Sequence, residues 1–130
     1  MTLTSSIPDV SNLKLLIVDD SMVMRRALTL SIQSSNFQEV RSAANGMLAL
    51  KQFRDFLPDV VTLDLTMPEL GGIEALEEML KIKPETKIMI VSALADDATA
   101  IEALKKGAEQ FICKPFTPEE LNQALLEMLS

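Results

Sequence analysis

The sequence predicts an α/β fold in which helices cover both faces of an open, doubly wound parallel sheet. Five short apolar runs alternate with longer segments of helical periodicity, which is the pattern of consecutive βα units. The chain has 130 residues and 48% of them are apolar, so one compact domain can bury such a sheet. Five units do not make a closed eight-stranded barrel, and we therefore expect the sheet to be open.

The first unit begins with the apolar run of residues 14–18, KLLIV, which we interpret as a buried strand that ends at Asp19 and Asp20. The next segment predicts an amphipathic helix, because its apolar residues lie three or four positions apart and form one stripe. That stripe consists of Met24, Ala27, Leu28 and Ile32. The second strand, residues 39–43, alternates polar and apolar side chains, which favours a place at the edge of the sheet.

A second helix follows Asn45 and Gly46, and its predicted buried face consists of Ala49, Leu50 and Phe53. The third strand, residues 60–63, is apolar and ends at Asp64. Residues 65–72 form a loop with a Met-Pro and a Gly-Gly pair, which leads into the third helix. The apolar face of that helix consists of Ile73, Leu76 and Leu80.

The fourth strand, residues 87–91, ends at Ser92. The fourth helix contains Ile101 and Leu104, and we expect Asp96 or Asp97 to cap its start and Gly107 to end it.

The fifth strand, residues 110–113, ends at the Lys-Pro pair of residues 114–115. The last helix has a well-marked start: Thr117 is its N-cap, Pro118 lies in its first turn, and Glu120 completes a capping box. Five such units favour the strand order 2-1-3-4-5 with five helices, which is the flavodoxin-like arrangement.

Composition and charge exclude several classes of function. The 12 basic and 19 acidic residues give a net charge of −7, which argues against nucleic acid binding because that requires clustered positive charge. No apolar run approaches the roughly 18 residues of a membrane span, and we expect no membrane partner. Without histidine the chain has no Ser-His-Asp or Cys-His apparatus and no His-ligated zinc.

The N-terminal residues and the single cysteine indicate the cellular compartment of the protein. Residues 1–12 are polar and carry no signal peptide, so we expect a loose N-terminal arm followed by one domain over residues 13–130. Cys113 excludes an internal disulfide bond and is expected to be buried in its short apolar strand. Together these features favour the reducing cytoplasm.

Polar side chains follow four of the five strands at the edge where parallel strands end. Asp19 and Asp20 follow the first strand, Asp64 the third, Ser92 the fourth and Lys114 the fifth. Taken singly, Asp20 suits an ordinary N-cap, Ser92 a turn residue and Lys114 a solvated side chain. Because ligands of doubly wound sheets bind in the crevice at this edge, the five residues together indicate a functional site.

Three carboxylates in one crevice repel one another unless a cation lies among them. Oxygen ligands without imidazole or thiolate favour Mg²⁺ or Mn²⁺. Such a site suits phosphoryl transfer, with Asp64 as the nucleophile, Ser92 as a hydrogen-bond donor to a phosphoryl oxygen, and Lys114 and the cation as neutralising charges. The glycine-rich loops of nucleotide sites are absent, so we expect no nucleoside triphosphate.

With these residues in place, the chain from about Leu13 to its last helix resembles the receiver domains of two-component response regulators. Asp19 and Asp20 resemble the acidic pair of that family, and Asp64 resembles its phosphoryl-accepting aspartate. Residues 114–115 resemble its lysine-proline pair, which often has a cis peptide bond.

The resemblance implies roles for further residues. Ser92 and Phe111 occupy the positions of the family's switch hydroxyl and switch aromatic residue, although Phe111 lacks the hydroxyl of the tyrosine found in many chemotaxis receivers. The metal ligands that the resemblance implies are Asp20, Asp64 and the main-chain carbonyl of Thr66, with Asp19 acting through a water molecule. The stretch of residues 19–26 is further similar to chemotaxis-type single-domain receivers.

The function that the resemblance implies is a phosphorylation-dependent switch. A separate histidine kinase would donate a phosphoryl group from its phosphohistidine to Asp64. The receiver would catalyse its own phosphorylation and slow autodephosphorylation, with no external substrate. A monomeric receiver would then present a changed face, made by its fourth helix, fifth strand and fifth helix, to an output protein such as a flagellar motor switch.

Other functions remain open at this point. The receiver could serve as a phosphorelay intermediate, as a phosphate sink or as part of a larger regulator. A phosphatase of the haloacid-dehalogenase type also uses an aspartyl nucleophile with Mg²⁺, but Thr66 occupies the place of its second aspartate. A flavin module on the same fold is disfavoured, because the loop after the first strand is acidic and lacks glycine, and would repel a phosphate.

Overall fold

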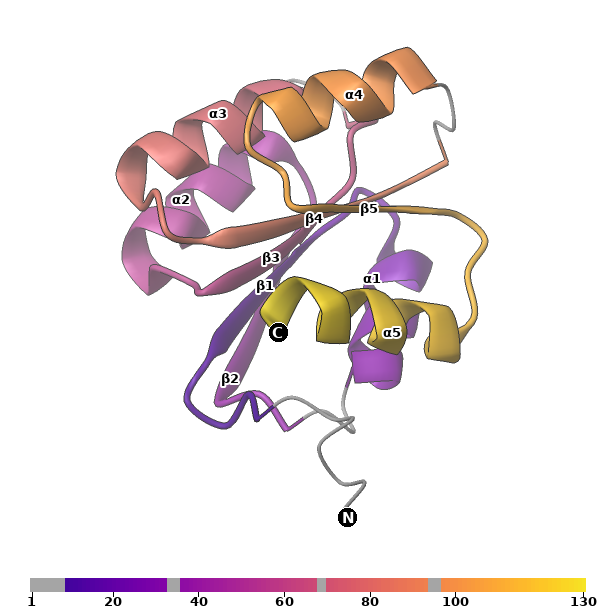
Figure 1. Cartoon of the computed structure of the whole chain (residues 1–130). Coiled ribbons are helices and arrows are strands. Elements are labelled where there is room, and N and C mark those ends of the chain that lie inside the picture. The colour runs from indigo at the N-terminus through magenta and orange to yellow at the C-terminus, as the bar shows by residue number, and fades with distance from the viewer. Residues whose placement is uncertain (1–8, 33–35, 68–69, 94–96) are drawn as a thin grey trace.

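The computed structural model describes residues 9–32, 36–67, 70–93 and 97–130 (Figure 1). Its strands are β1 (Lys14–Val18), β2 (Glu39–Ala43), β3 (Val60–Leu63), β4 (Lys87–Ser92) and β5 (Gln110–Cys113). Its helices are α1 (Met22–Ile32), α2 (Gly46–Phe56), α3 (Gly72–Ile82), α4 (Asp97–Lys105) and α5 (Pro118–Leu129). All strands are parallel and their order is β2-β1-β3-β4-β5, so the predicted fold class and strand order are confirmed.

Helices cover both faces of the sheet (Figure 1). Side chains of α2, α3 and α4 form one apolar cluster with alternate strand residues such as Leu16 and Val18. Side chains of α1 and α5 form a second cluster with the intervening residues, such as Leu15 and Ile17. The β1 run is continuously apolar because the strand is buried on both of its faces.

The helical stripes are only partly as predicted. On α1, Leu28 and Ile32 are buried and Met24 is partly buried, but Ala27 is exposed, so its assignment to the stripe is wrong. Ala27 lies about 100° around the helix from Leu28 and therefore turns away from the sheet. The predicted face of α2 is confirmed. On α3, Leu76 is buried, whereas the other fully packed positions are Ala75 and Met79, with Ile73 and Leu80 half-buried beside them.

The helix ends test the predicted caps. Thr117 accepts a hydrogen bond from the Glu120 N–H at 3.1 Å, and the Glu120 side chain accepts one from the Thr117 N–H at 2.8 Å, so the capping box is confirmed. Gly107 follows α4 with a positive φ of 115°, which favours glycine. Asp97 is the first residue of α4 and not its cap, whereas Asp96 lies outside the described residues.

The burial of two residues at the edges of the domain differs from what the sequence predicts. Cys113 is exposed, so its predicted burial is wrong. Cys113 is the last residue of β5, an edge strand with a neighbour on one side only, and no residue of that strand is fully buried. Val10 is buried within the stretch that was expected to be a loose arm. Across the described residues, no helix combines the length and apolar character that a membrane crossing requires.

Asp59 ties together three segments at the end of the sheet opposite the strand carboxyl ends. Its side chain accepts a hydrogen bond from the Lys14 N–H at 2.9 Å and from the Lys83 ammonium at 3.0 Å. Its backbone bonds both Lys14 and Lys87. Burial acts to raise the pKa of Asp59, but the Lys14 N–H and the lysine charges outweigh it, so the pKa lies below its ordinary value.

Asp59→Asn is expected to lower the free energy of unfolding by about 1 kcal/mol at pH 7, because it removes the ion pair between Asp59 and Lys83. The effect is modest because both side chains of this pair are partly exposed. The lowered pKa means that Asp59 stabilises the fold above the unfolded-chain pKa of about 4, and that this contribution disappears as the pH falls through the lower folded-state pKa. Urea unfolding from pH 7 to pH 2 should show the two proteins converging. Asp55→Asn, on the exposed side of α2, is the control and should follow wild type throughout.

Candidate functional site

The carboxyl ends of the central strands bring three aspartates together. Asp19 directly follows β1 and Asp64 directly follows β3, and β1 and β3 are neighbours in the sheet. The Asp19 and Asp64 residues are 1% and 4% exposed, whereas the next residue along the chain, Asp20, is exposed. Carboxylate oxygens of all three lie within 4.8 Å of one another, so the predicted acidic cluster is confirmed.

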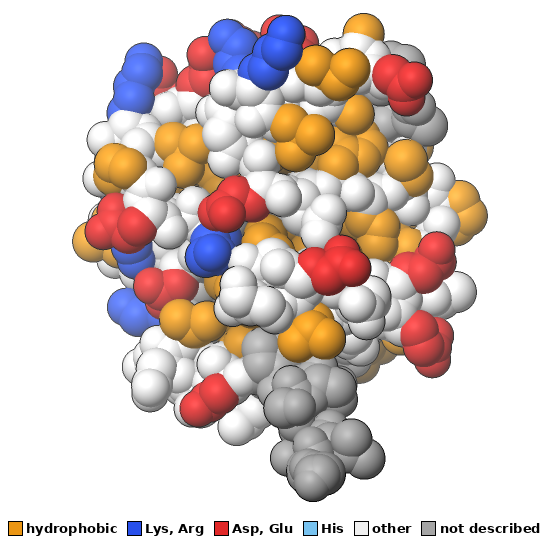
Figure 2. Space-filling view, viewed as in Figure 1, with side chains coloured by type: hydrophobic (Ala, Val, Ile, Leu, Met, Phe, Trp, Pro, Cys, Tyr) orange, Lys and Arg blue, Asp and Glu red, His pale blue; other side chains and the backbone are white. Residues whose placement is uncertain are grey.

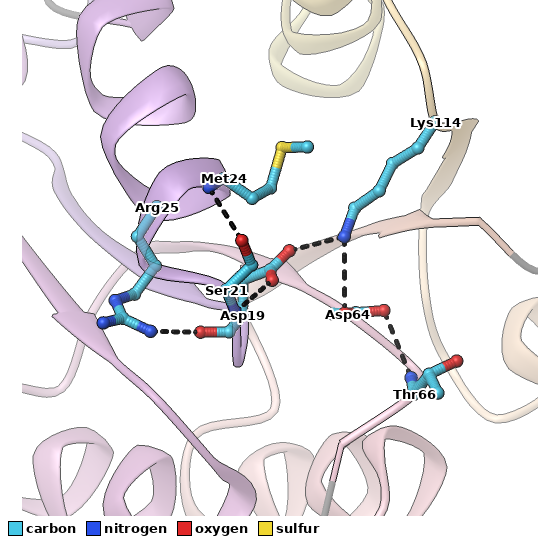
Figure 3. A network of polar contacts seen from close by, with 7 residues as sticks. All are labelled: Asp19, Ser21, Met24, Arg25, Asp64, Thr66 and Lys114. Atoms are coloured by element: carbon cyan, nitrogen blue, oxygen red, sulfur yellow. Dashed lines mark hydrogen bonds and ion pairs between the residues drawn. The ribbon is translucent and has the colours of Figure 1, made fainter.

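Lys114 supplies the positive charge of this cluster (Figure 3). It follows β5, and its ammonium lies 2.7 Å from Asp19 Oδ2 and 3.4 Å from Asp64 Oδ2. The peptide bond between Lys114 and Pro115 is cis, as the resemblance suggests. The Lys114 N–H also donates to the Ser92 carbonyl at 2.9 Å, which fixes the end of β5 against the end of β4.

Residues after β1 that the sequence pattern did not indicate hold Asp19 in place. The Ser21 N–H donates to Asp19 Oδ1 at 2.9 Å, and the Arg25 guanidinium donates to the Asp19 carbonyl at 2.7 Å (Figure 3). Ser21 Oγ accepts from the Met24 N–H at 3.1 Å, so Ser21 caps α1. The alternative role of Asp20 as that cap is therefore wrong. A serine immediately before the helical stripe was the available signal for the cap.

The electrostatics of the cluster follow from burial and from the single lysine. Burial raises the pKa of the Asp64 carboxyl, with a further upward effect of the nearby Asp19 charge. The Thr66 N–H, which donates to Asp64 Oδ1 at 3.1 Å, and the Lys114 ammonium oppose this rise only in part. For Lys114 burial acts to lower the pKa, but its contacts with Asp19 and Asp64 raise it overall.

The donor set of this cluster fits a hard divalent cation. It offers three carboxylates and neither imidazole nor thiolate, and oxygen ligands of this kind suit Mg²⁺ or Mn²⁺. One ammonium faces two buried carboxylates, which leaves the cluster short of positive charge. The residues present therefore fit a metal ion that would add positive charge.

The remaining predicted residues lie around this centre. Thr66 follows Asp64 by two residues, and its N–H donates to Asp64 Oδ1. Ser92 is the last residue of β4 and is fully buried. Phe111 lies in β5, opposite Ile90 in the β4–β5 register, and its half-buried ring packs against the cluster formed with α2, α3 and α4.

Gly72, which the sequence predicts only as part of a loop, has a specific role at the site. It is the first residue of α3, and its N–H donates to the Leu65 carbonyl at 3.3 Å. A Cβ on Gly72 would lie 2.5 Å from the Asp64 carbonyl oxygen and 2.5 Å from Leu65 Cα. Only glycine lets α3 start this close to the backbone that carries Asp64. A glycine at the start of a helix is a weak signal for such an approach.

Known proteins resemble this chain closely. The family model of the response regulator receiver domain matches residues 15–126. Chemotaxis protein CheY of Listeria monocytogenes is 43% identical over 113 residues, which cover 87% of this chain and 95% of that protein. Chemotaxis protein CheY of Thermotoga maritima is 43% identical over 112 residues, which cover 86% and 93% of the two chains.

A solved structure has the same arrangement. A chain in the crystal structure of the CheX–CheY–BeF3–Mg²⁺ complex from Borrelia burgdorferi superimposes with a TM-score of 0.87. It is 31% identical, and the match covers 91% of this chain and 90% of that chain.

Proposed function

Because the chain belongs to the response regulator receiver domain family, we propose that it is a phosphorylation-dependent switch that accepts a phosphoryl group on Asp64. One observation carries the proposal: a buried carboxylate at the end of the central strand lies 3.4 Å from a lysine ammonium and within 4.8 Å of two further carboxylates. A group in that position can act as a nucleophile only when its charge is balanced during the reaction.

The proposed step is a transfer between two protein groups. One carboxylate oxygen of Asp64 forms the new bond to phosphorus, while the bond from phosphorus to the donor's histidine nitrogen breaks. The electron pair of that bond stays on the nitrogen, which takes up a proton. Because this chain contains no histidine, the donor is a separate histidine kinase. The Lys114 ammonium lies beside Asp64 and can pair with a phosphoryl oxygen.

We further propose that Mg²⁺ is held by Asp20, Asp64 and the Thr66 main-chain carbonyl, with Asp19 acting through water. When bound, the ion supplies positive charge that offsets the charge of the phosphoryl oxygens. Asp20 suits direct binding because it is exposed, whereas Asp19 already accepts hydrogen bonds from Ser21 and Lys114.

Asp20→Ala is expected to weaken Mg²⁺ binding by about tenfold or more, because one of three charged ligands is removed. Calorimetric titration of the unphosphorylated chain measures this directly. Asp55→Ala removes an exposed aspartate on α2, outside the cluster, and should bind Mg²⁺ as wild type does. Equal affinity in Asp20→Ala and wild type would rule out the proposed ligand set.

The surface that responds to phosphorylation is proposed to be the face made by α4, β5 and α5. Ser92 would move toward the phosphoryl group, and the Phe111 ring would enter the space beside β4. A groove next to this ring runs between β5 and α5 and includes Ile112 and Glu127 in its lining. Figure 2 shows apolar side chains between α4 and α5 and acidic side chains over α5. An output protein, such as a flagellar motor switch, would bind there.

The switch is tested by NMR with beryllofluoride and Mg²⁺ as a stable phosphoryl mimic. The amide shifts of Lys105, Phe111 and Leu121 are expected to change. These residues lie in α4, β5 and α5, whereas the aspartates follow β1 and β3. Ser92→Ala should reduce the change without preventing binding of the mimic. Shifts confined to the loops around the aspartates and Lys114 would contradict the switch and favour a phosphate sink.

The remaining details of the proposed function concern the oligomeric state, the location and the pathway of the receiver. We propose that the receiver acts as a monomer in the cytoplasm, catalyses its own phosphorylation and slow autodephosphorylation, and takes part in chemotaxis signalling, which the similarity to CheY proteins supports. A role as a phosphorelay intermediate would instead require the phosphoryl group to pass from Asp64 to a second histidine protein.

A further inference from the structure

Basic side chains concentrate in one part of this acidic chain. Residues 22–56 carry five basic and two acidic side chains, although the whole chain has 12 basic and 19 acidic residues. These residues include α1, β2 and α2, at the β2 edge of the sheet (Figure 1). These three elements therefore carry a net positive charge in an otherwise acidic chain, at the edge of the sheet opposite β5.

The same part of the chain exposes large apolar side chains. Among the residues that the structure describes, nine large apolar side chains are prominently exposed, and six of these lie between residues 22 and 48. Met22, Val23 and Leu30 of α1 are 69%, 75% and 65% exposed. Met47 and Leu48 lie on α2, which packs on the other face of the sheet. The exposed apolar side chains of α1 and Val40 of β2 lie on one face, and such a group beside basic side chains indicates an interaction surface.

A groove of about 410 Å³ runs between α1 and β2, and we call it the α1–β2 groove. Its lining residues are Met22, Arg25, Arg26, Thr29 and Leu30 from α1 and Ser42 from β2. The five helical residues lie three or four positions apart and share one face of α1.

The groove exists because α1 leaves part of the sheet uncovered. Ser42 pairs with Ile17 in the β1–β2 register, and Val40 pairs with Leu15, so these β2 side chains lie on the same sheet face as α1. α1 contacts α5 on this face and does not extend over the β2 edge, where Val40 and Ser42 are exposed.

The groove combines two apolar contacts with two guanidinium groups. Met22 and Leu30 lie two turns apart at its ends, and Arg25 and Arg26 lie between them along α1. The hydrogen bond from Arg25 to the Asp19 carbonyl fixes one of these guanidinium groups in place. Guanidinium groups form paired hydrogen bonds with carboxylates, and this geometry favours carboxylate groups as their partners.

We propose that the α1–β2 groove binds an acidic amphipathic segment of a protein partner. Met22 and Leu30 contact apolar side chains of that segment, and Arg25 and Arg26 pair with its carboxylates. Charge complementarity selects this occupant, because the groove lining holds Arg25 and Arg26 and no acidic residue in a chain whose net charge is −7. The surface is separate from the β5–α5 groove and does not depend on phosphorylation of Asp64.

The test uses a short fluorescent peptide with leucine and glutamate at helical spacing, and a counterpart with lysine in place of glutamate. Fluorescence anisotropy with the full chain is expected to show binding of the glutamate peptide alone, and added salt should weaken it. Arg26→Glu should reduce affinity about fivefold, and Leu30→Ser should reduce it by a similar factor. Arg54→Glu makes the same charge change on α2, outside the groove, and should alter affinity less than about twofold.

Four outcomes would overturn the proposal. The first is equal affinity of Arg26→Glu, Leu30→Ser and wild type for the glutamate peptide, with urea unfolding confirming that both variants are folded. The second is preference for the lysine peptide. The third is binding to anionic phosphatidylglycerol vesicles without binding to the peptide, which would make the groove a membrane surface. The fourth is self-association in sedimentation that Arg26→Glu abolishes, which would make a second copy of this chain the occupant.

Discussion

Asp64→Asn is expected to abolish phosphoryl labelling of the protein. An amide cannot attack phosphorus as a carboxylate would. Asp19 also contacts Lys114, but it follows β1 and accepts hydrogen bonds from both Lys114 and Ser21, whereas Asp64 ends the central strand β3. The measurement is incubation with radiolabelled acetyl phosphate and Mg²⁺, followed by counting of label on the protein. Wild type should retain up to one phosphoryl group per chain, whereas a phosphatase of the haloacid-dehalogenase type would turn over many equivalents.

The control for this variant is Asp55→Asn, which changes an exposed aspartate on α2 and should be labelled as wild type is. Asparagine has nearly the size of aspartate, so loss of label in Asp64→Asn cannot be attributed to altered packing. Label on Asp64→Asn that hydroxylamine removes would be an acyl phosphate on another carboxylate, and would contradict the assignment of Asp64.

Gly72→Ala is expected to lower the free energy of unfolding by about 3 kcal/mol. The added Cβ would lie 2.5 Å from the Asp64 carbonyl oxygen and 2.5 Å from Leu65 Cα. Both are backbone atoms, so no side chain can move aside to relieve the overlap. Either α3 or the backbone at Asp64 must shift, and we therefore expect slower phosphoryl uptake as well. Urea unfolding of the full chain measures the stability change.

The adjacent glycine provides a matched control. Gly71 is the N-cap of α3 with a φ of −71°, and a Cβ there would approach only the Glu74 carboxylate oxygen, at 3.3 Å. Gly71→Ala is expected to change the free energy of unfolding by less than about 1 kcal/mol. Equal losses in the two variants would indicate that general loss of backbone freedom, and not contact with the Asp64 backbone, explains the effect.

The sequence could predict the acidic cluster because strand ends are well defined in a parallel sheet. The apolar runs of β1 and β3 stop at the residue where each strand ends, so Asp19 and Asp64 are placed by the lengths of these two strands alone. Lys114 is placed in the same way by β5. Parallel alignment then brings the three side chains to one edge without further information.

Other features could not be predicted, because they depend on contacts that sequence spacing does not determine. Asp20 and Ser21 both precede α1, and only the phase of the helix decides that Ser21 is the cap. A short apolar run has the same sequence pattern in a central strand and in an edge strand, so the pattern does not predict the exposure of Cys113 at the β5 edge. The approach of Gly72 to the Asp64 backbone follows from how closely α3 packs.

The contacts of Lys114 have a consequence for how the chain folds. Lys114 is separated from Asp19 by 95 positions in the sequence and from Asp64 by 50. Contacts over such separations form late, because the intervening chain must lose its freedom first. During synthesis, β1 and β3 can pair before β5 has left the ribosome, but the two buried carboxylates then face each other without a lysine. The two buried carboxylates therefore gain their ammonium partner only when the fifth strand docks, so this charge pairing belongs to the last stage of sheet assembly.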